Sequence, residues 1–215
     1  MSTSLDMLQT QSPVALQRRL PVMEHFYTLQ GEGAHTGRAA YFIRLAGCDV
    51  GCVWCDVKES WDADRHPGRT VEELMAIVQA SPATTAVITG GEPLMHDLLS
   101  LTETLQLAGI RTHLETSGSH PLTGAWDWVC LSPKKFKAPL PAVFPVANEL
   151  KVVVYHRSDL AWAEQQALAV QGDCQLFLQP EWSRKDLLLP VMLEYIQSHP
   201  RWRLSLQMHK YIHIP

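Results

Sequence analysis

The stretch RLAGCDVGCVWCDVKESW, residues 44–61, places three cysteines within eight positions, at Cys48, Cys52 and Cys55. A structural zinc site takes four thiolate or imidazole ligands in a closed tetrahedron, and its cysteines usually arrive as two close pairs. This stretch has one cluster of three and no second pair. The fourth ligand is therefore either distant in the chain or absent, and an absent ligand leaves a metal centre open to another molecule.

Two kinds of metal site fit three clustered cysteines. A four-iron cluster is held by cysteine thiolates, and a cluster with only three of them leaves one iron open to an exogenous ligand. The alternative is a zinc site completed by one of the chain's ten histidines. The missing second pair favours the iron–sulfur cluster, and the zinc-binding structural module stays open as an alternative.

Composition narrows the class of protein. The 215 residues are 46% hydrophobic, which predicts one domain over 1–215, with 1–20 as a possible flexible N-terminal extension. The net charge of −4 gives no basic surface, so we expect a small-molecule partner and no nucleic acid. No apolar run approaches the ~18 residues of a membrane span, which predicts a cytoplasmic protein without a membrane partner.

The remaining cysteines are expected to be structural. Disulfides are rare in the reducing cytoplasm, so the five cysteines are better interpreted as metal ligands or buried thiols. Cys130 and Cys174 lie beside or within apolar, strand-like runs. Both are predicted to be core residues.

Short β-rich runs alternate with amphipathic ones from about residue 40, a pattern typical of βα units with a parallel sheet. The predicted strands cover residues 40–45, 85–89, 111–115, 126–131, 149–154, 174–179 and 203–207. Apolar residues at three- and four-residue spacing predict helices over 70–79, 97–108, 159–170 and 186–197. Pro190 weakens the last of these unless it lies in the first turn.

Almost every predicted strand is followed by a small polar group of residues. These groups are TGGEP (89–93), ETSG (115–118), SPK (132–134), QPE (179–181) and QMHK (207–210). All of them should emerge at the C-terminal edge of a parallel sheet, where α/β barrels keep their active sites. Loops are polar for ordinary reasons, but several of them converging with a cysteine cluster predict a site.

GGEP, residues 90–93, is a second motif. Adjacent glycines let the backbone approach a ligand closely, and the carboxylate of Glu92 can receive an ammonium group. With C-x3-C-x2-C about 35 residues before it, the chain resembles the radical S-adenosylmethionine superfamily. The resemblance implies a 4Fe-4S cluster whose open iron chelates S-adenosyl-L-methionine, on an incomplete TIM-like (β/α) barrel with a parallel sheet.

Three further stretches resemble one family, 7-carboxy-7-deazaguanine synthase. They are FYTLQGEGAHTGRAAYFIRLAGC (26–48), CDVKESW (55–61) and LSLQMHKYIHIP (204–215). The resemblance implies conversion of 6-carboxy-5,6,7,8-tetrahydropterin to 7-carboxy-7-deazaguanine, with loss of ammonia, in the biosynthesis of queuosine and other 7-deazapurines. It also implies a flavodoxin- or ferredoxin-type electron donor and a homodimer.

Site residues follow from the same resemblance. Arg44 also has a physical argument: it lies between Ile43 and Leu45 on a strand, so it points away from one apolar face and can clamp a carboxylate, or else form a structural salt bridge. The cluster ligands are Cys48, Cys52 and Cys55. The implied contacts of S-adenosylmethionine are Trp54, Cys55, Asp56, Gly91, Glu92, Ser132, Pro133, Lys134 and Gln179. The implied contacts of the substrate are Leu29, Gln30, Gly31, Arg44, Thr89 and Pro215.

One position departs from the family. Members typically have Cys-Asp-Thr after the cluster, and the threonine hydroxyl is a Mg²⁺ ligand, whereas this chain has Val57. Mg²⁺ keeps waters readily, so a water can replace one lost hydroxyl, and we expect a weakened Mg²⁺ site. A radical activase acting on a partner protein shares the cysteines and remains an alternative function, although it has no use for LQGEG (29–33).

Overall fold

The computed structural model describes residues 19–215. The predicted extension over 1–20 lies almost entirely outside the described residues, and its last residue, Leu20, already belongs to the first strand. None of the helices within residues 19–215 combines the length and the apolar character needed to cross a membrane.

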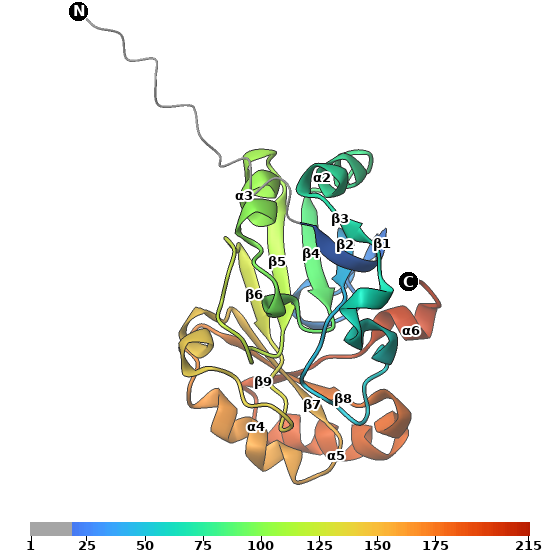
Figure 1. Cartoon of the computed structure of the whole chain (residues 1–215). Coiled ribbons are helices and arrows are strands. Elements are labelled where there is room, and N and C mark those ends of the chain that lie inside the picture. The colour runs from blue at the N-terminus through green and yellow to red at the C-terminus, as the bar shows by residue number, and fades with distance from the viewer. Residues whose placement is uncertain (1–18) are drawn as a thin grey trace, which may run out of the picture.

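Within residues 19–215, nine strands form one sheet in the order β3-β1-β2-β4-β5-β6-β7-β8-β9 (Figure 1). The strands from β2 to β9 are parallel, and β1 runs antiparallel to both β2 and β3. Because β3 and β9 stand at opposite edges, the sheet is the predicted incomplete barrel. The bounds are β1 Leu20–Leu29, β2 Ala39–Leu45, β3 Gly68–Arg69, β4 Thr85–Gly90, β5 Arg111–Thr116, β6 Trp128–Leu131, β7 Glu149–Val154, β8 Gln175–Pro180 and β9 Trp202–Leu204.

All seven predicted strands are present, and two strands were not predicted. β6 begins two residues later than predicted, and β9 ends at Leu204, three residues early. The predicted loop at 207–210 is wrong, because Met208 begins a short helix there. β1 was missed because Pro21 and the polar residues Glu24 and His25 obscure its strand pattern, and β3 is only two residues long.

The helices pack on the outer face of the sheet. Figure 1 shows α2 and α3 over one half of the sheet and α4 and α5 over the other. Local signals start some of them: Thr70 and Glu73 form a reciprocal capping box before α2. The bounds are α2 Val71–Gln79, α3 Leu99–Leu107, α4 Asp159–Ala167, α5 Lys185–Ser198 and α6 Met208–Ile212, with 3₁₀ turns at Gly33–His35, Lys58–Trp61, Ala63–Arg65, Pro93–Met95, Pro141–Val146 and Trp182–Arg184.

The helix predicted over 186–197 is confirmed as α5, although Pro190 lies in its interior and not in its first turn. Its side chain is exposed, while Leu188 and Met192 on the same helix are buried against the sheet. A proline inside a helix removes one backbone hydrogen bond. Burial of the apolar face stabilises the helix enough to offset that loss.

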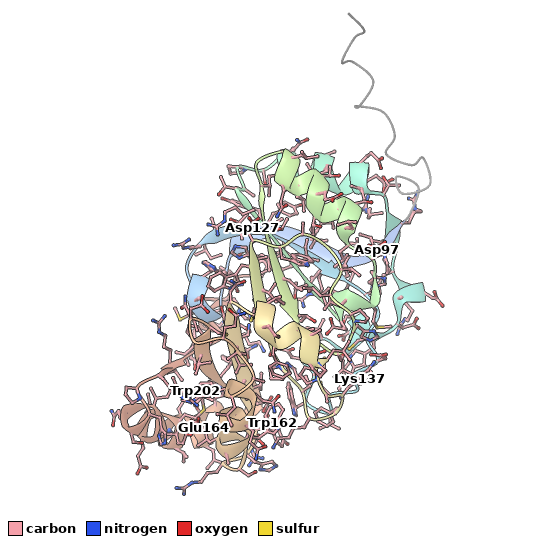
Figure 2. The ribbon with its side chains drawn as sticks, turned by 90° about the vertical axis from the view of Figure 1, so that its left-hand side faces the viewer. Asp97, Asp127, Lys137, Trp162, Glu164 and Trp202 are labelled. Atoms are coloured by element: carbon pink, nitrogen blue, oxygen red, sulfur yellow. The ribbon has the colours of Figure 1, made fainter. Side chains whose placement is uncertain are left out.

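A buried tryptophan joins the last strand to the outer helices. Trp202 is 1% exposed, and its indole Nε1 donates to Glu164 Oε1 on α4 at 2.7 Å. Figure 2 labels both residues, which lie at the same end of the molecule. The half-buried Tyr195 of α5 donates to the same carboxylate oxygen at 2.7 Å, so one acidic group satisfies two donors.

Alternation along the parallel strands separates an apolar face from a polar one. The residues facing the helices are fully buried and apolar: Ile43, Ile88, Leu114, Leu150 and Leu178. The residue after each of them points to the concave side of the sheet: Arg44, Thr89, Glu115, Lys151 and Gln179. The interior of the partial barrel is therefore lined by polar and charged side chains.

Candidate active site

The loops at the C-terminal ends of the strands line one cavity of about 220 Å³. All five predicted polar groups contribute to it, so the prediction that they converge with the cysteines is confirmed. We call it the cysteine cavity. Its lining includes Cys48, Cys52, Trp54, Cys55, Asp56, Thr89, Gly91, Glu92, Glu115, Ser132, Lys134, Gln179, Glu181 and Gln207.

A second cavity of about 430 Å³ adjoins the first. We call it the arginine cavity, and its lining includes Leu29, Gln30, Gly31, Arg44, Val57, His209, Lys210 and Pro215. The two cavities share five lining residues, which are Glu32, Asp56, Thr89, Glu115 and Gln207. A molecule in one cavity therefore lies next to a molecule in the other, and we call the shared region the junction.

The predicted site residues divide between these cavities. Those assigned to the cluster and to S-adenosylmethionine line the cysteine cavity, except Pro133, which lies in a neighbouring groove with Trp54 and Lys134. Those assigned to the substrate line the arginine cavity, and Thr89 lines both. The residues that the resemblance assigns to S-adenosylmethionine and to the substrate therefore line two separate, adjoining cavities.

The two glycines of GGEP let this loop pack directly on the cysteine loop. A Cβ at Gly91 would lie 2.4 Å from the Gly47 carbonyl oxygen and 2.9 Å from Cys48 Cβ. Gly90 has φ 151°, and its Cβ would lie 2.1 Å from the Leu45 carbonyl oxygen. Backbone hydrogen bonds fasten the contact, from Gly91 N to Leu45 O at 2.9 Å and from Glu92 N to Gly47 O at 2.8 Å.

Glu92 is occupied by hydrogen bonds from the protein itself. Its carboxylate is 1% exposed and accepts from the Thr116 hydroxyl, the Ser117 hydroxyl and the Ser117 and Leu94 backbone N–H groups at 2.5–3.0 Å. A carboxylate has about four acceptor positions, so these bonds fill them. Glu92 thus fixes the GGEP loop to the end of β5, and direct contact with an ammonium group stays a prediction.

The three cysteines fit an iron–sulfur cluster. All three are free, and burial raises the pKa of the Cys52 thiol to about 11 and also raises that of Cys48. Buried thiols become thiolates when a metal replaces the proton. Among residues 19–215, no three His, Cys, Asp or Glu side chains are gathered as the ligands of one metal ion would be. Three thiols around one cavity suit a cluster, whose thiolates bind separate irons.

Arg44 lines the arginine cavity and also forms a salt bridge, so both predicted alternatives are present. Its Nε donates to Glu24 Oε1 at 2.6 Å, and its side chain is 20% exposed. Within the described chain its terminal guanidinium nitrogens make no hydrogen bond to protein. They remain available to bind a carboxylate from the cavity.

The C-terminal segment returns to the site and packs on the LQGEG loop. Met208 N donates to Gly31 O at 2.9 Å, and a Cβ at Gly31 would lie 2.2 Å from His209 Nδ1. Lys210 reaches across to the cysteine loop, where its Nζ contacts Asp56 Oδ2 at 2.5 Å. These contacts bring Pro215 to the wall of the arginine cavity.

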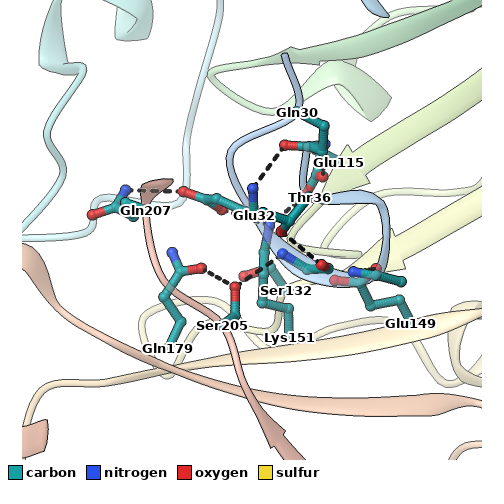
Figure 3. Close-up of polar contacts among 12 residues, drawn as sticks. Gln30, Glu32, Thr36, Glu115, Ser132, Glu149, Lys151, Gln179, Ser205 and Gln207 are labelled. Atoms are coloured by element: carbon teal, nitrogen blue, oxygen red, sulfur yellow. Dashed lines mark hydrogen bonds and ion pairs between the residues drawn. The ribbon is translucent and has the colours of Figure 1, made fainter. Parts of the chain in front are cut away.

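Sequence reasoning missed Lys151, and it gave no individual role to Glu32 or Glu115, which it named only within LQGEG (29–33) and ETSG (115–118). Glu32 and Glu115 line both cavities, and Lys151 lies between them (Figure 3). One signal was available: ELKVVV (149–154) carries charged residues at alternate positions of a predicted buried strand, so both must face the interior. Gln207 was placed at this edge as part of QMHK (207–210), but nothing in the sequence indicated its hydrogen bond to Glu32.

Comparison with known proteins agrees with this arrangement. Residues 42–131 match the Radical SAM superfamily. The chain is 51% identical over 211 residues to the 7-carboxy-7-deazaguanine synthase of Flavobacterium psychrophilum, covering 97% of this chain and all of the relative. The chain belongs to the 7-carboxy-7-deazaguanine synthase family. The family predicted from the sequence is therefore confirmed, and the cluster and S-adenosylmethionine follow as its cofactors.

Other synthases of the family are similar over most of their length. The synthase of Synechocystis sp. is 50% identical, covering 89% of this chain and 92% of the relative. The Escherichia coli K12 synthase is 37% identical, covering 90% and 98%. The crystal structure of QueE from Escherichia coli superposes with a TM-score of 0.80 at 36% identity, covering 89% of this chain and 95% of that one.

Proposed function

We propose that this synthase converts 6-carboxy-5,6,7,8-tetrahydropterin to 7-carboxy-7-deazaguanine with loss of ammonia, at the junction of the two cavities. One observation supports this proposal most strongly: the cysteine cavity and the arginine cavity share five lining residues. When bound, the cluster and S-adenosylmethionine supply the radical chemistry, which begins at C6 of the substrate.

The chain's own residues orient the reactants. Cys48, Cys52 and Cys55 would hold the cluster, and Trp54, Asp56, Gly91, Ser132, Lys134 and Gln179 would surround S-adenosylmethionine. The terminal nitrogens of Arg44 would bind the substrate carboxylate, while the backbone at Leu29, Gln30 and Gly31 would face the flat ring. Thr89 lines both cavities, so its hydroxyl would lie beside C6.

The test is turnover by anaerobically purified protein with the pterin as sole substrate. We expect bound iron and sulfide, together with 7-carboxy-7-deazaguanine and ammonia in equal amounts. Iron-loaded protein that cleaves S-adenosylmethionine but leaves the pterin unchanged would favour the activase. Colourless protein that retains zinc would favour the structural module.

Mg²⁺ is proposed as a weak cofactor. Val57 lines the arginine cavity, but its side chain offers no oxygen, and its backbone carbonyl already accepts from Ser60. One carboxylate oxygen of neighbouring Asp56 is engaged by Lys210. A hydrated ion held by substrate oxygens would still fit. Titration of chelator-treated protein should show a weak Mg²⁺ response that Val57→Thr strengthens. Tight dependence in both proteins would contradict the proposal.

Further parts of the proposal rest on the family resemblance and composition. They are action as one radical S-adenosylmethionine domain, a homodimer, and reduction by a flavodoxin- or ferredoxin-type protein. A cytoplasmic location suits five free cysteines, since thiols stay reduced there.

A further inference from the structure

Lys151 is a buried charge in the interior of the partial barrel. Its side chain is 4% exposed, and its Nζ lies 2.6 Å from Glu32 Oε2 and 2.9 Å from Glu115 Oε2 (Figure 3). Removing an ammonium from water is costly unless it is paired and hydrogen-bonded. Lys151 meets this requirement by bridging two carboxylates from distant parts of the chain, the loop after β1 and the end of β5.

Each bridged carboxylate also accepts from a glutamine amide, the Cys130 thiol contacts Glu115 as well, and both carboxylates keep one open side. Gln207 Nε2 donates to Glu32 Oε1 at 2.9 Å, and Gln30 Nε2 donates to Glu115 Oε1 at 3.2 Å. A carboxylate can accept about four hydrogen bonds, so each retains acceptor positions. The two side chains are 19% and 20% exposed, and both line the junction.

The other ionisable groups around Lys151 leave its pairing intact. Glu149 lies two residues away on β7, and burial raises its pKa to about 7; burial likewise raises the pKa of Cys130 on β6 well above its ordinary value. His209 on α6 and Lys134 after β6 are the other ionisable groups acting here, one on Glu32 and one near Lys151. Cys130 is therefore neutral, and Glu149 is at least partly protonated. Most of the negative charge around Lys151 is carried by Glu32 and Glu115.

We propose that Lys151 is a positioning residue of this reaction: its ammonium holds Glu32 and Glu115 together as charged hydrogen-bond acceptors at the junction, facing the N–H groups of the substrate ring. The inference rests on the proposed function. Without the ammonium, two neighbouring half-buried carboxylates repel each other, and one of them takes up a proton. That proton converts an acceptor into a donor, which is mismatched to an N–H group.

The charge state of Glu32 supports the same role. Burial acts to raise the pKa of Glu32, but the charge and hydrogen bond of Lys151 outweigh it and lower the pKa to about 2. Removing Lys151 leaves burial opposed only by the smaller effects of the Gln207 hydrogen bond and the charge of His209, so the pKa of Glu32 moves upward. A residue that only filled space would not change this proton balance.

Anaerobic calorimetry tests the proposal in the cluster-loaded enzyme with S-adenosylmethionine left out. Binding of 6-carboxy-5,6,7,8-tetrahydropterin is measured in two buffers of different ionisation heat, which reports the protons released on binding. We expect none from wild type between about pH 6 and pH 8. The Lys151→Met enzyme should release about one proton when it binds the pterin. Its affinity for the pterin should fall roughly tenfold for each unit by which the pH is lowered. The control Lys135→Met removes an ammonium paired with Asp159 outside both cavities, and it should match wild type.

A matched pair covers the case in which Lys151→Met does not fold. Glu115→Gln and Glu115→Gln/Lys151→Met differ only in Lys151. The double variant leaves one carboxylate, that of Glu32, without its lysine, whereas Lys151→Met leaves two. Only the double variant should release a proton on binding. Equal proton release within the pair, or a proton released by wild type, overturns the role of Lys151. If wild type does not turn over the pterin at all, the proposed function fails instead.

Discussion

Gly91→Ala should damage the cysteine loop without touching a cysteine. The added Cβ would lie 2.4 Å from the Gly47 carbonyl oxygen, whereas ordinary contacts begin at 3.4 Å, so backbone must move by about 1 Å. Both contacting segments are backbone held by the hydrogen bonds Gly91 N to Leu45 O and Glu92 N to Gly47 O. Neither can rotate away as a flexible side chain would.

The cost follows from overpacking and from those two hydrogen bonds. Overpacking costs about 1–3 kcal/mol, and each weakened hydrogen bond costs about 0.5–1.5 kcal/mol. These costs sum to about 2–6 kcal/mol, and a central value of about 4 kcal/mol lowers the melting midpoint of a chain this long by about 8–16 °C. The fold should survive, because domains are stable by about 5–15 kcal/mol, but Cys48 is displaced.

The assay is iron and sulfide per chain after anaerobic reconstitution, together with the melting midpoint. Gly91→Ala should bind less than half the iron of wild type. Gly172→Ala is the matched control, because its Cβ would meet nothing within 4 Å. Full iron and an unchanged midpoint in Gly91→Ala would refute the close packing of GGEP on the cysteine loop.

Four other predictions use different parts of the structure. Cys48→Ala, Cys52→Ala and Cys55→Ala should each lose iron, while Cys130→Ala and Cys174→Ala keep it; iron analysis decides. Arg44→Ala should lose about 2–5 kcal/mol of substrate binding, at least an order of magnitude in calorimetry, whereas Glu24→Gln should lose much less. Burial raises the pKa of Glu149 from 4.5 in the unfolded chain to about 7 in the folded chain. The folded state therefore holds the proton more tightly, and the free energy of unfolding falls as pH rises from 4.5 to 7. Glu149→Gln should therefore melt higher than wild type at pH 8 and equally at pH 4, and a pH-independent difference would contradict this. A tag after Pro215 should impair turnover, and full activity would mean that the chain end is not part of the site.

The sequence was most informative where a strand pattern and a motif coincide. The strand before TGGEP, for example, was predicted with its loop, and both the strand and the loop's position at the cavity are confirmed. β1 was not predicted, because an antiparallel outer strand with polar residues on both faces lacks a distinctive period. Its position matters, since it carries LQGEG to the mouth of the barrel.

The junction was hidden for a different reason. Glu32, Glu115 and Lys151 are separated by more than 30 residues from one another. Glu115 and Lys151 come together across the parallel strands, and the loop after β1 brings Glu32 to them. Charged residues in isolation are usually solvated at a surface. Only their burial and mutual distances show that they form part of the site.

The central claim is that the hydrogen atom at C6 of the pterin is abstracted at the junction of the two cavities. The most direct measurement is turnover of substrate carrying deuterium at C6, followed by mass spectrometry of the product and of the recovered S-adenosylmethionine. The resemblance to the family implies that the cofactor is regenerated in each turnover, so we expect deuterium in the S-adenosylmethionine. Product formed with no deuterium in the recovered S-adenosylmethionine would contradict the account.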